Sequence, residues 1–139
     1  MTRAKPKVGD VIQVELPTGR YAYGRVLRDA SVAFYATTSD EPAHPPLGSR
    51  DYQFVVGVYE DVLKSSSVPV VGRDPSRDPD DEWPPPNCVR DPLTGAVEIY
   101  HRGVIRPPEP NENIDLEPAA VWDLHHVIDR IMGFRDTPD

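Results

Sequence analysis

Two histidines and an aspartate near the C-terminus come closest to a metal-binding pattern. His126 and Asp129 are three residues apart, so on a helix they would share one side and could supply two ligands to a metal ion. His125 cannot join them, because adjacent helical residues point about 100° apart. A third ligand would have to come from a distant residue, and His101 is the first candidate. We therefore predict no metal site and no cofactor, and interpret these residues as a solvated polar face.

The residues that could act as nucleophiles lack the surroundings that nucleophilic catalysis requires. Cys88 follows three prolines and an asparagine, without the motif of a cysteine protease around it. The serines at 65–67 do not form the glycine-flanked turn that exposes a catalytic serine. The glycines are dispersed, and none begins a helix in the pattern that cradles phosphate. The sequence therefore predicts a protein that binds a partner and is not an enzyme.

An acidic stretch that ends in a tryptophan is the main candidate for a binding surface. It lacks the alternating oxygen ligands, central glycine and distal glutamate of a calcium loop, and prolines interrupt it. Tryptophan is over-represented among the residues that dominate protein interfaces, and carboxylates would attract a basic partner. The alternative is a solvated loop whose tryptophan packs on the core. The candidate contact residues are Asp78, Asp80, Asp81, Glu82 and Trp83.

Charge and composition argue against several classes of function. The 139 residues carry a net charge of −8: residues 1–35 have six basic and three acidic groups (+3), and residues 36–139 have nine and twenty (−11). Such a surface repels nucleic acid, which proteins bind mainly through lysine and arginine, and attracts a basic protein. No apolar run approaches the roughly 20 residues of a membrane-spanning helix, and a single cysteine suits a reducing compartment. We expect a cytoplasmic protein that binds neither nucleic acid nor a membrane.

Most of the expected elements are short strands. The 17 prolines limit element length, because proline is excluded from helix interiors and central strands. Apolar alternation and short turns predict a strand meander over 7–72, and then a strand and loop over 96–116. The segment 73–95 is expected to be an acidic proline-rich loop, and no core element is expected within residues 73–86. An apolar stripe over 117–133 predicts one helix, with Glu117-Pro118 in its first turn.

These elements predict a single α+β domain over residues 1–139. The expected fold is a curled antiparallel sheet, SH3-like or a partly open barrel, with one C-terminal helix packed on it. Gly24, inside a strand, predicts a bulge or bend that lets the sheet curl. An alternative function is an SH3-like adaptor that binds a peptide or a regulatory protein through aromatic side chains on adjacent strands. These aromatic residues, which we interpret mainly as core, are Tyr21, Tyr23, Phe34 and Tyr35.

The first strands also carry a pattern that resembles a known family. A Gly-Asp pair, an apolar strand, a proline-containing turn and a Tyr-x-Tyr-Gly-x-Val segment resemble the N-terminal signature of the immunity protein 26 family of bacterial polymorphic toxin systems. The resemblance is specific over 7–28, looser over 96–132 and absent from 36 to 90. The matching residues, which we interpret as structural, are Gly9, Asp10, Pro17, Gly19, Tyr21, Tyr23, Gly24 and Val26.

The resemblance implies a function and a partner. Immunity proteins bind a cognate toxin that is encoded beside them and block it by steric occlusion, and they are usually small, cytoplasmic and non-enzymatic. If the toxin is a nuclease with a basic active-site cleft, the carboxylates of the acidic stretch would take the place of phosphates there. Because the matching residues are structural, we expect the toxin contact to lie in the long loops, including the stretch that ends at Trp83.

Overall fold

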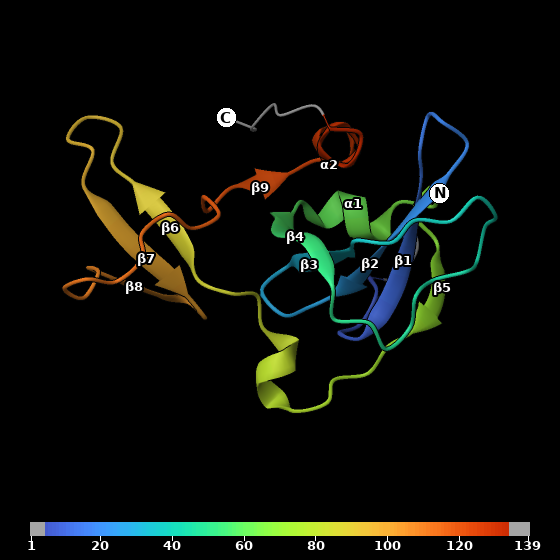
Figure 1. Cartoon of the computed structure of the whole chain (residues 1–139), viewed down its shortest axis with the longest axis horizontal. Coiled ribbons are helices and arrows are strands. Elements are labelled where there is room, and N and C mark those ends of the chain that lie inside the picture. The colour runs from blue at the N-terminus through green and yellow to red at the C-terminus, as the bar shows by residue number, and fades with distance from the viewer. Residues whose placement is uncertain (1–4, 134–139) are drawn as a thin grey trace.

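Two β-sheets organise the chain, which the structure, a computed structural model, describes over residues 5–133 (Figure 1). A six-stranded sheet has the order β5-β1-β2-β3-β4-β9, and a three-stranded sheet has the order β6-β7-β8. The predicted α+β class is confirmed. The strands are β1 (Asp10–Glu15), β2 (Tyr21–Val26), β3 (Ser31–Tyr35), β4 (Tyr52–Val58), β5 (Val70–Arg73), β6 (Asn87–Arg90), β7 (Val97–His101), β8 (Val104–Arg106) and β9 (Val121–Trp122). The helices are α1 (Glu60–Lys64), a 3-10 helix η1 (Pro79–Glu82) and α2 (Leu124–Ile131).

The larger sheet begins as the expected meander. Strands β1 to β4 pair in sequence, each antiparallel to the next, and β5 returns antiparallel to the free side of β1. At the opposite edge, β9 adds parallel to β4 through Gly57 and Val58. The register shifts between Val11 and Ile12 and again between Phe34 and Tyr35, so the sheet is irregular at two points.

Gly24 is not at either irregularity, so the bulge predicted there is wrong. It pairs regularly with Ile12 on one side and Phe34 on the other. Its lack of a side chain serves close packing instead, because a Cβ at this position would lie 2.4 Å from Cγ1 of Val32. The small residue thus lets β2 pack closely against the side chains of β3.

Helices cover one face of the larger sheet. Alternate residues of the meander point to this face and form the main core, with Val62 and Leu63 of α1 and Val127 of α2. Leu124 and Ile128 of α2 add partly buried contacts, so the predicted packing of the C-terminal helix on the sheet is confirmed. The sheet residues of this core include Ile12, Val14, Ala22, Val26, Val32, Phe34, Phe54, Val56 and Val58.

Loops cover the other face, which makes β2 and β3 buried on both sides. The Tyr23 hydroxyl forms a hydrogen bond with the Ser39 hydroxyl, and the Tyr35 hydroxyl donates to the Asp74 carboxylate. In the segment 73–95, Asp74 is itself buried, so the expectation that residues 73–86 form no core element is wrong. This segment also contains η1 and β6. The physical reason is that buried polar side chains on the sheet need hydrogen-bond partners, and the loop supplies them.

The C-terminal helix begins at Leu124, not in the region of Glu117-Pro118. Val121 and Trp122 form strand β9 instead. Asp123 caps the helix, because its carboxylate accepts a hydrogen bond from the His126 N–H at 2.9 Å. The predicted apolar stripe is correct from Leu124 onward. Both residues pair with the edge of β4, and β-branched and aromatic residues are generally favoured in strands.

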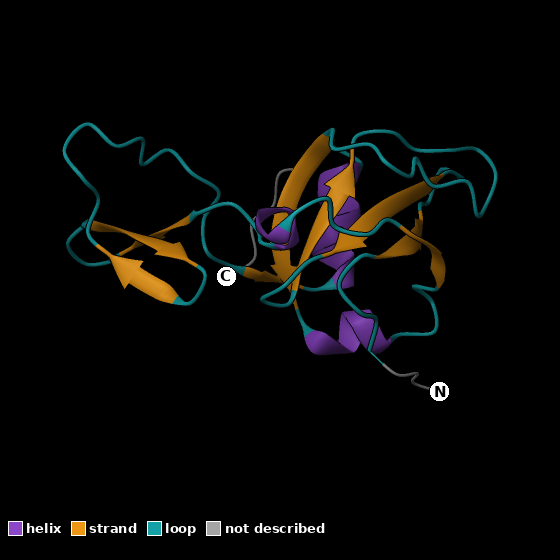
Figure 2. Cartoon of the chain, turned by 90° about the horizontal axis from the view of Figure 1, so that it is seen from below, coloured by secondary structure: helices purple, strands orange, loops and turns teal. Residues whose placement is uncertain are grey.

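The three-stranded sheet stands beside the larger one (Figure 2). Its β6 edge is joined to the segment before β9, where the Cys88 N–H donates to the Glu117 carbonyl and the Ala119 N–H donates to the Cys88 carbonyl. A tight hairpin with Arg102 and Gly103 at positive φ connects β7 to β8. No helix within residues 5–133 is long and apolar enough to cross a bilayer.

Candidate functional site

A buried arginine lies beneath the acidic stretch. Arg25 of β2 is fully buried and is oriented toward the loop-covered face. Its Nε donates to the Asp74 carbonyl at 2.8 Å, its Nη1 to the Asp81 carbonyl at 2.7 Å, and its Nη2 to the Ser76 hydroxyl at 2.9 Å. One guanidinium therefore holds the chain at three points between β5 and η1, and it fixes the path of the acidic stretch over the sheet.

A second arginine joins two carboxylates of this stretch. Arg50 donates from Nη1 to Asp74 Oδ2 at 2.9 Å and from Nη2 to Asp81 Oδ2 at 2.8 Å. Asp74 Oδ2 also accepts from the Tyr35 hydroxyl at 2.6 Å and from the Gly48 N–H at 3.0 Å. We call these five side chains, Arg25, Tyr35, Arg50, Asp74 and Asp81, the buried network.

The buried network holds its carboxylates in the charged form. Burial alone would raise the pKa of Asp74, but hydrogen bonds from Tyr35, Gly48 and Arg50 together lower it below its ordinary value. The pKa of Asp81 is lowered in the same way, because hydrogen bonds from Arg50 and the Arg77 N–H outweigh its burial. Burial and the hydrogen bond to Asp74 raise the pKa of the Tyr35 hydroxyl, which therefore remains a donor. These groups form a satisfied structural cluster.

The five predicted contact residues fall into different environments around η1. Asp78 caps η1, because its carboxylate accepts from the N–H groups of Asp80 and Asp81. The Asp81 side chain is turned inward to the buried network and is 19% exposed. The Asp80 side chain is turned outward and is 82% exposed. Glu82 is partly buried beside Arg28, with Arg28 Nε 3.0 Å from Glu82 Oε2.

Trp83 follows η1 and lies between two arginines from distant parts of the chain. The guanidinium carbon of Arg28 lies 5.7 Å from the ring centroid, and that of Arg102 lies 5.4 Å away, both within cation–π range. Arg102 also pairs with Asp80, with Arg102 Nη2 2.9 Å from Asp80 Oδ1. The sequence suggested either an exposed anchor or a core lid for Trp83. The structure places it half-buried, as a bridge between the larger sheet and the β7–β8 hairpin.

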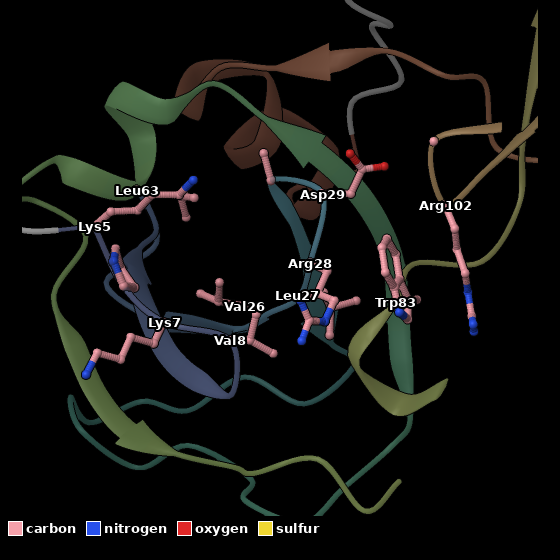
Figure 3. A pocket seen from close by; sticks show the side chains of 13 residues that line it. Lys5, Lys7, Val8, Val26, Leu27, Arg28, Asp29, Leu63, Trp83 and Arg102 are labelled. Carbon is pink, nitrogen blue, oxygen red and sulfur yellow. The ribbon is translucent and has the colours of Figure 1, made fainter. Parts of the chain in front are cut away.

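A hollow of about 590 Å³ opens beside Trp83 (Figure 3). Its walls come from the N-terminal segment 5–8, the end of β2 and its turn, α1, and the β7–β8 hairpin. Its volume lies within the range of roughly 300–1,000 Å³ typical of ligand pockets. Trp83, the last residue of the acidic stretch, also lines the hollow, so the carboxylates of the stretch and the hollow lie on either side of its ring.

Sequence reasoning did not identify the buried network or the hollow. One signal for the buried network was present, because Arg25 alternates with Tyr21 and Tyr23 and so lies on the face of β2 that carries their rings. An arginine in the middle of a predicted strand needs either solvent or buried acceptors. The pairing with Arg50 and Asp74 depends on loop paths that no local pattern encodes.

The suspected metal ligands are not brought together. His125 Nε2 lies 3.3 Å from Asp129 Oδ2, and His126 Nδ1 lies 2.9 Å from Asp123 Oδ1. Within the described part of the chain, no group of three or more histidine, cysteine, aspartate or glutamate side chains is arranged to hold a metal ion. Cys88 is buried in β6, where its Sγ lies 3.3 Å from the Leu116 carbonyl oxygen.

The aromatic surface of the adaptor hypothesis is not exposed. Tyr23, Phe34 and Tyr35 are buried, Phe34 within the main core and the two tyrosines beneath the loops. Only Tyr21 of the four is partly accessible. The three buried rings therefore cannot stack on a ligand, and their interpretation as core is confirmed.

The chain matches the model of a known protein family. The model of a family described as Immunity protein 26 matches residues 7–96, which is well over half of the chain. The matched range contains the meander, the buried network and η1, and it ends before β7. No curated protein and no solved structure matches the chain.

Proposed function

Because this chain belongs to the immunity protein 26 family, we propose that it binds a cognate bacterial toxin and neutralises it by steric occlusion. The family match is the observation that carries this proposal. In this proposal the protein acts in the cytoplasm by binding the toxin, and it needs neither a catalytic group nor a cofactor. The toxin is a protein encoded beside it.

The acidic stretch from Asp78 to Trp83 is the proposed first contact with the toxin. Its backbone is anchored by Arg25, and η1 is capped by Asp78, so little conformational freedom is lost when a partner binds. Asp80 projects its carboxylate outward from this rigid support. A basic cleft on the toxin would attract it, and the net charge of −8 would accelerate their encounter.

Co-expression tests the proposed function directly. A bacterial host that carries the toxin gene from the same locus should survive when this protein is produced and die when it is not. Survival must be accompanied by a complex of the two purified proteins, because steric occlusion requires binding. Death of the host despite folded, abundant protein would show that the proposed function is wrong.

Charge removal on the acidic stretch tests the proposed contact. The double variant Asp80→Ala/Glu82→Ala should weaken toxin affinity by about tenfold or more and flatten its salt dependence, because two interface charges are lost. Asp81 is left intact because it belongs to the buried network. The control Glu98→Ala/Asp115→Ala removes the same charge from exposed positions and should leave affinity within about threefold. Equal affinities of the two variants would contradict the acidic contact.

A further inference from the structure

The hollow beside Trp83 is locally cationic, although the chain as a whole is acidic. Four basic side chains line it, two from the N-terminal segment and two that flank the Trp83 ring (Figure 3). Among the described residues that line it, only Asp29 is acidic. The formal charge of these described lining residues is therefore four minus one, or +3, in a chain whose net charge is −8. The basic side chains are those of Lys5, Lys7, Arg28 and Arg102.

The two lysines differ from the two arginines in their pairing. Arg28 and Arg102 each pair with a carboxylate of the acidic stretch and contact the face of Trp83. Lys5 and Lys7 are exposed, and among residues 5–133 no carboxylate oxygen lies within 4.0 Å of either ammonium group. Asp29 is not paired with either lysine, and its Oδ2 accepts a hydrogen bond from the Tyr100 hydroxyl at 2.5 Å. The hollow thus has positive charge available for an incoming anion.

The floor of the hollow is apolar. The apolar side chains that remain accessible there, and so form the floor, are those of Val8, Ala30 and Trp83. Val26, Leu27 and Leu63 also line the hollow but are at most 5% exposed. An anion that is a bare ion or a phosphate would leave this floor in contact with water. A ligand that carries an apolar group next to its negative charge would cover the floor and satisfy the lysines together.

The backbone at the rim is held in an uncommon conformation. Asp29 and Ala30 in the β2–β3 turn have φ values of 65° and 50°, and Arg102 in the β7–β8 hairpin has a φ of 53°. Left-handed backbone at residues other than glycine costs roughly 1 kcal/mol or more each, and such residues concentrate at functional sites. The two turns approach each other through the Tyr100–Asp29 bond and through Trp83, which fixes the rim before any ligand arrives.

We propose that this hollow receives an acidic segment of the toxin, whose carboxylates pair with Lys5 and Lys7 while an adjacent aliphatic side chain covers the apolar floor. The inference rests on the proposed function and adds a second contact of opposite sign beside the acidic stretch. A partner must then present a basic surface and an acidic segment on either side of Trp83. A toxin that presents only the basic surface or only the acidic segment would bind more weakly, so the two contacts together would give specificity.

A protein segment fits the charge balance of the molecule better than a nucleic acid. A long polyanion would meet the acidic stretch as well as the lysines, and the carboxylates would repel its phosphates. A short acidic segment needs a positive field only over the width of the hollow. At physiological salt, charges further than about 8 Å away are largely screened, so Lys5 and Lys7 can act in spite of the net charge, whereas Glu82 and Asp80 offset the charges of Arg28 and Arg102.

Charge reversal of the lysines tests the proposal on the toxin complex. Lys5→Glu and Lys7→Glu should each weaken affinity by about tenfold or more, mainly through slower association, because attraction becomes repulsion. Arg90→Glu, on the exposed side of β6, makes the same change in net charge and should alter affinity by less than about threefold. Neither lysine side chain has an ion pair to lose within the described residues, and Arg90 loses only an exposed hydrogen bond to the Gly95 carbonyl, so all three variants should fold like the parent protein. If both lysine variants bind the toxin as Arg90→Glu does, the hollow is not a toxin contact.

A titration without the toxin separates this inference from the proposed function. A short peptide of alternating glutamate and leucine, added to the full chain, should shift the NMR signals of the Trp83 indole N–H and the Gly103 amide. A lysine-leucine peptide, inorganic phosphate and a short single-stranded DNA should shift them much less. Larger shifts with phosphate or DNA, or none with the acidic peptide, would overturn the proposal. If the toxin does not bind the parent protein, the proposed function fails and this titration alone decides on the hollow.

Discussion

The Nε–H of Arg25 donates to the backbone carbonyl oxygen of Asp74 at 2.8 Å, so a buried strand residue holds a loop residue 49 positions further along the chain. The same guanidinium reaches the carbonyl oxygen of Asp81. Backbone acceptors do not depend on the side chain at their position. The acidic stretch can therefore change its outward side chains while Arg25 keeps its path, which is a useful property for a loop that contacts a partner.

We expect Arg25→Met to lower the free energy of unfolding by about 2 to 4 kcal/mol. Methionine fills much of the space, but it leaves the carbonyl groups of Asp74 and Asp81 buried without a donor. Urea denaturation followed by circular dichroism measures the loss. Arg28→Met, just beyond the same strand, removes an equal charge from an exposed side chain and should cost less than about 1 kcal/mol. Equal losses for the two variants would contradict a structural role for the buried guanidinium.

Acid should destabilise the fold through the buried network. The pKa values of Asp74 and Asp81 are lowered in the folded protein, although burial alone would raise them, because hydrogen bonds to tyrosine, arginine and backbone groups favour the charged forms. A lowered folded-state pKa stabilises the protein fully above the unfolded-state pKa, and this stabilisation is lost as the pH falls toward the folded-state value. We therefore expect the free energy of unfolding to fall below about pH 4.

Denaturation at several pH values checks this expectation. Asp74→Asn keeps the shape of the side chain and removes one of the titrating groups, so it should be less stable at neutral pH and lose less on acidification. Glu98→Gln, which removes an exposed carboxylate, is the control and should follow the parent curve. An Asp74→Asn curve parallel to the parent curve would show that Asp74 does not contribute to the acid sensitivity.

Gly24→Ala should destabilise the protein by about 1 to 3 kcal/mol. The new Cβ would lie 2.4 Å from Val32 Cγ1 and 3.1 Å from Phe34 Cε1, so buried side chains must shift. Gly57→Ala in β4 is the matched strand variant, because its Cβ would come no closer than 3.4 Å to the Ala120 carbonyl oxygen. Thermal unfolding of both variants distinguishes them. A similar change in melting temperature would mean that Gly24 is not required for close packing.

The sequence predicted those elements that depend on interactions between residues close together in the chain. The four-strand meander follows from alternation and turn residues, and the apolar stripe after Leu124 predicts a helix packed on the sheet. The predicted start of that helix was wrong, because Val121 and Trp122 pair with β4. The apolar periodicity of the helix does not indicate this long-range pairing. Tertiary context overrides propensity in such short segments.

The candidate site was predicted only in part, for a related reason. The acidic stretch is visible as a run of carboxylates, but its sorting into inward and outward side chains depends on Arg25 and Arg50, which are distant in sequence. The hollow combines residues from five separate segments, and two of its cations precede the first strand. Only the folded chain brings Lys7 and Arg102 to one cavity.

The neighbours Asp80 and Asp81 should separate stability from recognition. Asp81→Ala removes the acceptor of Arg50 and of the Arg77 N–H, so we expect it to lower the free energy of unfolding by about 1 to 3 kcal/mol. Asp80→Ala breaks only an exposed pair with Arg102 and should cost less than about 0.5 kcal/mol. If the proposed function holds, Asp80→Ala should nevertheless weaken toxin affinity and reduce its dependence on salt, because its carboxylate is the one that faces a partner. Denaturation and calorimetric titration of both variants measure the two effects, and a toxin affinity unchanged by Asp80→Ala would remove the acidic stretch from the interface while leaving its structural role intact.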